Sequence, residues 1–364
     1  MWKCSIHPDF AENTLLKEFL SNEVTISYDD ALKIDEVVIS RKDEKGCYIK
    51  KQVWKEILSY FETYTIDIWM RNYDYYFLQY ALNDWENNNY DTLIVGSSYA
   101  CFGYEERVAG LNAKNLALPS QDLYYASKIV EKCKEKNCAV KNILIGLGYY
   151  SFFSDLSRTE NEEELTRISN VYYPIFQDAH NAIILPEQMG MKQSRVWDLQ
   201  TIIKFFSNEI WRATKGTYFS VIHDRKKWKT VTWEDSFKEW DELLPQERES
   251  AGRKRAQFHN KSIAYSESYA ENIWILNELA NQCEKDQINL YICVFPVTTE
   301  YRKYIDKQIV ENFWNALSRI KGKIHVLDLN ESNGFDIADF NDMDHLSACG
   351  AIKATNLINN VIMG

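Results

Sequence analysis

The chain has 364 residues, of which 45% are hydrophobic, so it can form roughly two to three domains or one large domain with insertions. Its formal net charge of −11 argues against nucleic acid and anionic membranes as partners, because both require a concentrated basic surface. No basic start followed by an apolar segment opens the chain, and no apolar run reaches the roughly 18 residues of a membrane span. We therefore expect a soluble, cytoplasmic protein without a membrane span.

The eight cysteines are scattered along the chain. Cys101, Cys293 and Cys349 lie inside apolar patterns, where a reduced, buried thiol is favoured over a disulfide or a metal ligand. Cys133 and Cys138 are too far apart for a Cys-x-x-Cys motif, and no histidine lies near them in the sequence. We therefore expect neither a metal site nor a cofactor.

Residues 1–90 are predicted to form a mostly helical N-terminal extension. Apolar and aromatic residues recur at helical spacing around 15–20 and from 54 to 85, while residues 37–39 are typical of a strand that enters a turn. A helical layer that packs on the sheet or on another subunit is favoured over an aromatic ligand site. Homo-oligomerisation is therefore one of the alternatives. The extension carries no identifiable chemistry.

Residues 91–156 are typical of the first half of a doubly wound sheet. An apolar strand is expected at 92–96 and ends just before Ser98, a helix is expected from Ser120 onward, and a second strand is expected at 142–148. A strand–helix–strand order of this length implies parallel pairing. Open α/β sheets bind ligands at the carboxyl ends of their strands, so Ser98 is expected at such an edge.

Between about residues 157 and 260 a charged and aromatic insertion interrupts this pattern, and it is too long for an ordinary loop. Helices are expected within it at 198–213 and 233–244. Its tryptophans are candidates for stacking on sugars, but filling a small satellite core is favoured for any one of them. The tryptophans of this segment are Trp197, Trp211, Trp228, Trp233 and Trp240.

The remainder restores the α/β pattern, with helices expected at 264–285 and 304–320 and strands at 289–295 and 324–329. An acidic loop follows the last strand, but its spacing of carboxylates does not fit an EF-hand. We interpret it as a solvated loop in which one carboxylate serves a histidine. Ser347 is expected to cap the final helix.

Ser98, Asp342 and His345 supply one group for each step of a nucleophilic relay. A hydroxyl is a weak nucleophile until a base takes its proton, and a carboxylate fixes the tautomer of that base and stabilises its cation. Asp342 stands three residues before His345, which suits this pairing. The alternatives are Asp344 and Asp339 for the carboxylate and, ranked far lower, His259 for the base.

These motifs resemble those of the SGNH (GDSL-like) hydrolases, most closely the branch that acts on bacterial polysaccharides and cell-wall polymers. The resemblance covers residues 91–364. It implies a three-layer α/β/α flavodoxin-like sandwich with a central parallel sheet. It also implies that Ser98 is the nucleophile, Asp342 the orienting acid and His345 the base.

The same resemblance implies an oxyanion hole, with two departures from the family pattern. The block that begins at Asn115 has Ser120 where the family has glycine, and the block that begins at Gly148 has Tyr150 where the family has asparagine. The backbone N–H of Ser120 and the hydroxyl of Tyr150 are both donors. For Tyr150, two roles are about equally favoured. It contacts the oxyanion or substrate, or it is a packing residue that closes the site.

The function implied by the resemblance is that of a serine-dependent carbohydrate esterase or O-acyltransferase. Its substrate would be a bacterial polysaccharide or glycan precursor, or another small ester, and the acyl group would pass through Ser98. The alternative is a catalytically inactive SGNH-like domain that binds a glycan or a protein partner, which the departures at Ser120 and Tyr150 favour. A thioesterase or lysophospholipase-type lipase is a third possibility, weakened by the lack of an apolar lid.

Overall fold

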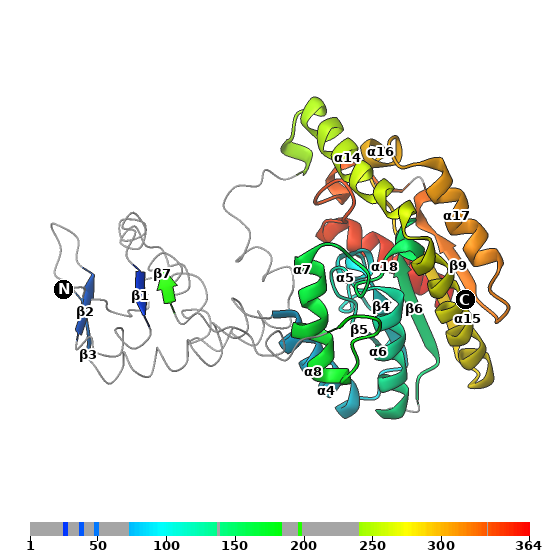
Figure 1. Cartoon of the computed structure of the whole chain (residues 1–364), viewed down its shortest axis with the longest axis horizontal. Helices are drawn as coiled ribbons and strands as arrows, with labels where there is room; N and C mark the ends of the chain where they lie inside the picture. The colour runs from blue at the N-terminus through cyan, green and yellow to red at the C-terminus, as the bar shows by residue number, and fades with distance from the viewer. Residues whose placement is uncertain are drawn as a thin grey trace. The chain divides into compact units, whose positions relative to one another are not determined.

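The computed structural model describes residues 25–27, 36–39, 47–50, 73–136, 139–183, 196–198, 240–332 and 334–364 (Figure 1). The chain divides into two compact units, of which the first comprises residues 1–77 and 186–236 and the second residues 78–185 and 237–364. The described residues of the first unit include two antiparallel strand pairs. These are β1 (Thr25–Ser27) with β7 (Val196–Asp198), and β2 (Glu36–Ile39) with β3 (Cys47–Lys50).

The strand expected at 37–39 is confirmed as β2. The described residues before 73 all lie in strands, although the sequence predicts a mostly helical extension. The helical pattern expected from 54 to 85 is described only in its last part, as helix α4 (Tyr73–Asn87). The pattern around 15–20 lies outside the described residues.

A five-stranded parallel sheet forms the centre of the second unit, in the order β5-β4-β6-β8-β9. Every residue of β4 and β6 is buried, and their Leu, Ile and Val side chains point to both faces of the sheet. Strands of this kind require helices on both faces, so the predicted α/β class is confirmed. The strands are β4 (Thr92–Gly96), β5 (Ala113–Asn115), β6 (Asn142–Leu147), β8 (Asn289–Val294) and β9 (His325–Asp328).

The chain reverses its direction of travel across the sheet at β4. β5 follows β4 in the chain and pairs on one side of it, whereas β6 pairs on the other side, from Thr92 opposite Asn142 to Gly96 opposite Gly146. Such a reversal opens a crevice at the carboxyl ends of the strands, where α/β proteins bind ligands. Gly96 has φ 119° there, and a Cβ on it would overlap the carbonyl oxygen of Gly146, so only glycine fits.

Helices pack on the sheet in two groups: α5 contacts α18, and α6 contacts α15 (Figure 1). Ile94 of β4 shares a buried cluster with Ala354 and Ile358 of α18. Among the described helices, none has the length and apolar character needed to cross a membrane. The helices of the second unit, after α4, are α5 (Ser98–Gly103), α6 (Leu123–Lys136), α7 (Glu162–Arg167), α8 (Tyr173–Phe176), α14 (Pro245–Asn260), α15 (Ser266–Lys285), α16 (Thr299–Arg302), α17 (Lys307–Ser318) and α18 (Ala348–Met363).

Most elements expected after residue 90 are confirmed. The strands expected at 92–96, 142–148, 289–295 and 324–329 are β4, β6, β8 and β9, and the helix expected at 264–285 is α15. The helix expected at 304–320 is α17, and the short helix α16 precedes the expected range. The hydroxyl of Ser347 accepts the Gly350 N–H at 3.3 Å, as expected for the cap of α18.

Helix α14 is the main correction within the insertion, because the sequence predicts no helix at 245–260. Its surface is largely polar, and its buried residues are Gly252, Ala256 and His259. Of the expected helix at 233–244, residues 240–242 form a single 3₁₀ turn and residues 233–239 lie outside the described ranges. The expected helix at 198–213 lies outside them too, except Asp198, which ends β7. Trp240 is 2% exposed and fills the core.

Candidate active site

Ser98 begins helix α5 directly after the carboxyl end of β4. The Gly96 N–H donates to Gln121 Oε1 at 2.7 Å, which ties this strand-to-helix turn to the neighbouring loop. Ser98 is buried, yet it lines a cavity of about 390 Å³. The carboxyl end of β4 therefore presents Ser98, together with Ser97, to a cavity at the point where the strand order reverses.

The ring of His345 connects Ser98 to Asp342. Its Nε2 lies 2.8 Å from Ser98 Oγ, and its Nδ1 lies 2.9 and 3.0 Å from the carboxylate oxygens of Asp342. With Nδ1 protonated, His345 donates to Asp342 and leaves Nε2 free to accept the serine proton. The structure thus brings together the three side chains that the sequence suggests for a nucleophilic relay.

The loop that carries Asp342 and His345 is held by hydrogen bonds within the loop and by one to Thr298. Asp342 Oδ1 accepts the backbone N–H groups of Asp344 and His345 at 3.0 and 2.8 Å, an arrangement that fixes the carboxylate as in an Asx turn. The carbonyl of Met343 accepts the Thr298 hydroxyl at 2.7 Å. The relay is therefore pre-oriented by contacts that do not involve Ser98.

The two alternative carboxylates have other partners. Asp339 Oδ2 accepts hydrogen bonds from Lys353 Nζ at 2.6 Å and from the Asp336 N–H at 2.9 Å. Asp339 therefore fixes the loop before α18. Asp344 accepts Arg255 Nε at 2.9 Å, and its other oxygen lies 3.6 Å from His345 Nδ1. Of the three candidate carboxylates, Asp342 thus lies nearest to His345 Nδ1.

Several groups shift the pKa of His345. Burial by itself lowers this pKa, but Asp342 and Asp344 raise it, and the net pKa lies above the usual value of an imidazole; Arg255 acts in the lowering direction. More of His345 is protonated at a given pH than in a free imidazole. The fraction of His345 in the neutral form, which can accept a proton, therefore increases as the pH rises through the raised pKa.

Ser120 lines the same cavity in an unusual backbone conformation. Its φ of 54° lies in the left-handed region, which glycine adopts without a steric penalty. The turn around it is closed by the Gln121 N–H, which donates to the Leu118 carbonyl at 3.1 Å. A serine therefore keeps the backbone shape that suits the glycine expected from the family pattern.

Tyr150 lines the cavity, and its ring stacks on His259 with centroids 3.8 Å apart and planes at 26°. Burial, more than any nearby charge, raises the pKa of its hydroxyl to about 12. The hydroxyl therefore stays protonated at neutral pH and can donate a hydrogen bond.

Gly148 and Asn115 do not offer donors to the cavity in this arrangement. The Gly148 N–H donates to the hydroxyl of Ser151 at 2.9 Å, and a Cβ on Gly148 would lie 2.5 Å from the ring of Tyr99. The amide of Asn115 is buried and donates to the carbonyls of Ala100 and Tyr104 at 2.9 and 3.1 Å. Both residues shape the loops beside Ser98.

Arg255 and His259 of α14 also line the cavity. The sequence offers His259 only as a low-ranked alternative base and does not identify Arg255 as part of the site. His259 is 3% exposed, and its Nδ1 lies 2.7 Å from the Tyr301 hydroxyl. Burial, with Arg255 and His345 nearby, lowers its pKa far below the usual value, so it is neutral. Gly252, Ala256 and His259 stand at helical spacing, but none is a large apolar residue, so the sequence carries only a weak signal of this face.

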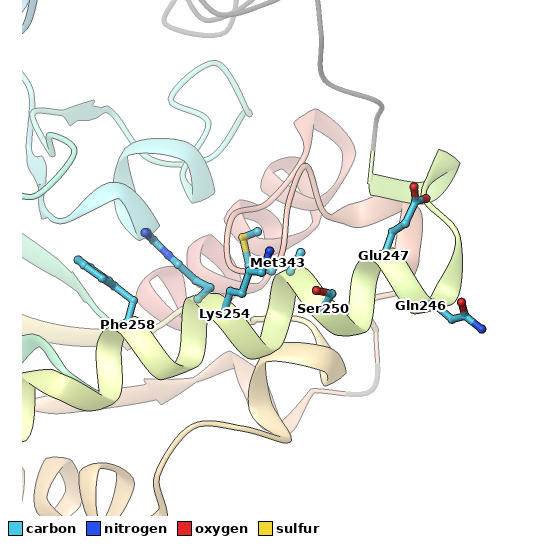
Figure 2. A pocket seen from close by; sticks show the side chains of 8 residues that line it. Gln246, Glu247, Ser250, Lys254, Phe258 and Met343 are labelled. Atoms are coloured by element: carbon cyan, nitrogen blue, oxygen red, sulfur yellow. The ribbon is translucent and has the colours of Figure 1, made fainter.

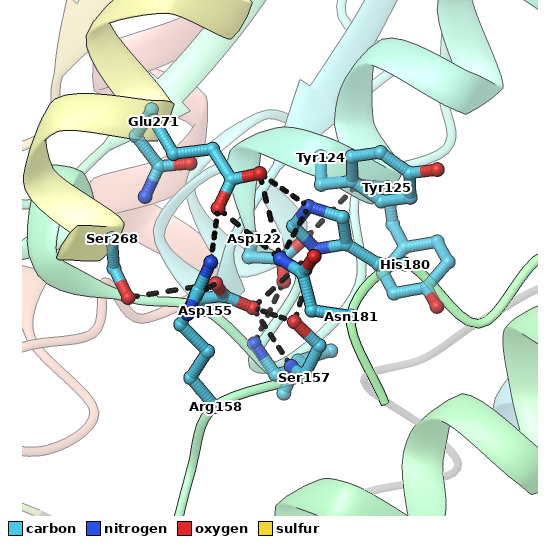
Figure 3. Close-up of polar contacts among 12 residues, drawn as sticks. Asp122, Tyr124, Tyr125, Asp155, Ser157, Arg158, His180, Asn181, Ser268 and Glu271 are labelled. Carbon is cyan, nitrogen blue, oxygen red and sulfur yellow. Dashed lines mark hydrogen bonds and ion pairs between the residues drawn. The ribbon is translucent and has the colours of Figure 1, made fainter. Parts of the chain in front are cut away.

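A second polar cluster, of which Asp155 lines the cavity, joins residues 155–183 to α15 (Figure 3). His180 Nε2 lies 3.0 Å from Glu271 Oε1, and its Nδ1 lies 3.5 Å from Asp155. These three residues could hold a metal ion by distance, as could Asp342, Asp344 and His345. Arg158 already pairs with both carboxylates of the first cluster and Arg255 with Asp344 of the second, so we assign no metal to either.

An open groove of about 710 Å³ follows α14 away from the cavity (Figure 2). Gln246, Ser250 and Lys254 line it, together with Met343 of the loop that carries His345. Arg255 and Phe258 border both the groove and the cavity.

Comparison of the chain with models of known protein families gives no match, and no curated protein matches it significantly. Inferences about its chemistry therefore rest on the residues and geometry of the chain itself.

Proposed function

We propose that this protein is a serine-dependent carbohydrate esterase or O-acyltransferase that resembles the SGNH hydrolases. One observation carries the proposal: the continuous relay from Ser98 Oγ through His345 to Asp342 beside a cavity, with 2.8 and 2.9 Å steps. This arrangement contains a nucleophile, a base and a carboxylate that orients the base. The strand order, second-first-third-fourth-fifth along the chain, also supports a flavodoxin-like three-layer sandwich over residues 91–364.

In the proposed mechanism, His345 Nε2 takes the proton of Ser98 as Oγ attacks the carbonyl carbon of an ester. The tetrahedral oxyanion would be held by the backbone N–H groups of Ser98 and Ser120 and by the hydroxyl of Tyr150. His345 then returns its proton to the leaving alcohol, which leaves an acyl group on Ser98. Water completes hydrolysis, and a sugar hydroxyl completes transfer, with His345 again as the base.

The proposed substrate is the acyl ester of a bacterial polysaccharide or of a glycan precursor. The family resemblance suggests this class. The groove along α14 supports it, because an extended chain needs space beyond the cavity of the reacting ester.

The second candidate is a catalytically inactive domain that binds a glycan or a protein partner. Its support is the state of the donors around Ser98: the Gly148 N–H is engaged by Ser151, and Ser120 and Tyr150 replace the residues expected from the family pattern. Loss of one oxyanion donor typically lowers kcat by about 100- to 1000-fold.

Intact-mass spectrometry after exposure to a serine-reactive fluorophosphonate distinguishes the two candidates. We expect one adduct on the wild-type protein and none on Ser98→Ala, because only a hydroxyl activated by His345 reacts quickly. Ser97→Ala is the matched control and should react like wild type, since the Ser97 side chain makes no capping bond to α5. A folded wild-type protein that forms no adduct would reject the enzyme and leave the binding domain.

A further inference from the structure

Helix α14 places the cation of Arg255 beside the relay, although α14 is remote in the sequence from Ser98, Asp342 and His345. Arg255 Nε donates to Asp344 Oδ2 at 2.9 Å, and the hydroxyl of Tyr99 donates to the same oxygen at 3.2 Å. The side chain of Asp344 is fully buried, and its Oδ1 lies 3.6 Å from His345 Nδ1. A second carboxylate therefore lies beside the proposed base.

Asp344 is costly to bury without a partner, because a carboxylate loses its hydration in the protein interior. Its Oδ1 has no hydrogen-bond partner among the described residues. The guanidinium of Arg255 is thus its nearest compensating charge. Without this cation, Asp344 would attract the Nδ1–H of His345 and compete with Asp342 for it.

The charged and titratable groups around His345 come from three elements. Asp342 and Asp344 belong to its own loop, and Tyr99 of α5 has its ring centroid 5.8 Å from that of the imidazole. Arg255 and His259 come from α14, and His259 is neutral because burial lowers its pKa. The local balance is therefore two carboxylates and one guanidinium around one imidazole.

We propose that Arg255 is a positioning residue of this site, which holds Asp344 in place and offsets its charge so that Asp342 alone orients His345. The role in catalysis rests on the proposed function, whereas the electrostatic role does not. Met343 is held separately by Thr298, so loss of the Arg255–Asp344 pair is not expected to unfold the loop.

The test is an NMR titration of His345 in the full-length protein with ¹³C at histidine Cε1, assigned with a His345→Gln variant. Arg255→Gln removes the cation that lowers the pKa of His345, so the midpoint should move to higher pH. Asp344→Asn removes a carboxylate that raises this pKa, so the midpoint should move to lower pH. Arg255→Lys keeps the charge and should stay near wild type.

A second readout is the pH dependence of fluorophosphonate labelling of Ser98, which should shift in the same directions. Opposite shifts are the result expected of a charge balance, whereas a merely structural role would slow labelling at every pH alike. An unchanged midpoint in Arg255→Gln, or a shift in the same direction as Asp344→Asn, overturns the proposal. If Arg255→Gln does not fold, an unmoved midpoint in Asp344→Asn overturns it instead.

If the wild-type protein is not labelled at all, the proposed function fails. The NMR midpoints of His345 still decide the role of Arg255, because they require no turnover.

Discussion

The position of Tyr150 is compatible with two roles, donation of a hydrogen bond to an oxyanion and packing. It borders the cavity of Ser98, and burial keeps its hydroxyl protonated with a pKa of about 12, as an oxyanion donor requires. Its ring also stacks on His259, which is the contact expected of a packing residue. Removal of the hydroxyl alone separates the two roles.

For Tyr150→Phe we expect a decrease of about 100-fold or more in the rate of fluorophosphonate labelling, because one donor to the developing negative charge is lost. The phenyl ring retains the contact with His259, so the melting temperature should change little. The labelling reaction is quenched at a series of times, and mass spectrometry of the samples gives the rate of adduct formation.

Tyr149→Phe is the matched control for this change. Tyr149 packs edge-on against Phe313, with ring centroids 5.5 Å apart, and is not among the residues that line the cavity. A Tyr150→Phe rate equal to that of Tyr149→Phe would mean that Tyr150 only packs and that the oxyanion hole relies on backbone donors.

At the scale of elements, the segment 155–183 is fastened to α15 through His180. The ring of His180 stacks on Tyr124 at 3.7 Å between centroids and contacts the carboxylates of Glu271 and Asp155 (Figure 3). Burial by itself lowers the pKa of His180, but hydrogen bonds and charges of Asp155 and Glu271 raise it above 6.5. The protonated ring is thus the form that this contact stabilises.

We predict that this contact makes the stability of the protein depend on pH. A histidine whose pKa is raised by folding stabilises the native state fully below its unfolded value of about 6.5, and this stabilisation is lost as the pH rises through the folded value. Urea unfolding midpoints of wild type should therefore fall over that range relative to those of His180→Gln. A constant difference between the two proteins at all pH values would contradict the prediction.

At the scale of the whole molecule, three parts of the second unit meet at Gly146. A Cβ on this residue of β6 would overlap the Cβ of Ala100 in α5 and lie 2.8 Å from the ring of Phe295, which follows β8. The absence of a side chain lets α5, which begins with Ser98, pack close to the sheet. The stability of the core and the position of Ser98 therefore depend on the same contact.

Gly146→Ala should decrease the free energy of unfolding by about 1–3 kcal/mol, because overpacking displaces α5 or the strand. It should also slow the labelling of Ser98. Urea unfolding measures the first effect and mass spectrometry the second. Gly334→Ala is the control, since a Cβ there meets nothing within 4 Å; equal stability of the two variants would show that the core adapts without cost.

The parallel strands that are fully or largely buried could be predicted from the sequence, since runs such as 92–96 and 289–295 are apolar and β-branched. β5 (Ala113–Asn115) could not, because three residues with a lysine in the middle carry no such pattern. Helix α14 was missed for a related reason: it buries Gly252, Ala256 and His259, none of which is a large apolar residue.

The members of the proposed relay could be chosen from the sequence, because Ser98 follows a strand and Asp342 and His345 share one short loop. The choice among Asp339, Asp342 and Asp344 could not be secured in that way, since it depends on where each side chain points. The structure separates them by their partners, which are Lys353, His345 and Arg255 respectively.

By itself, the sequence determined the α/β pattern of the second unit and the three candidate groups of the relay, because both follow from local apolar runs and short motif spacing. Only the tertiary structure decided that Arg255 and His259 border the same cavity and that the amide of Asn115 supports the backbone instead. These roles depend on packing between residues far apart in the chain. Local pattern carries no information about such contacts, because they form only when the helix and the sheet bury their faces together.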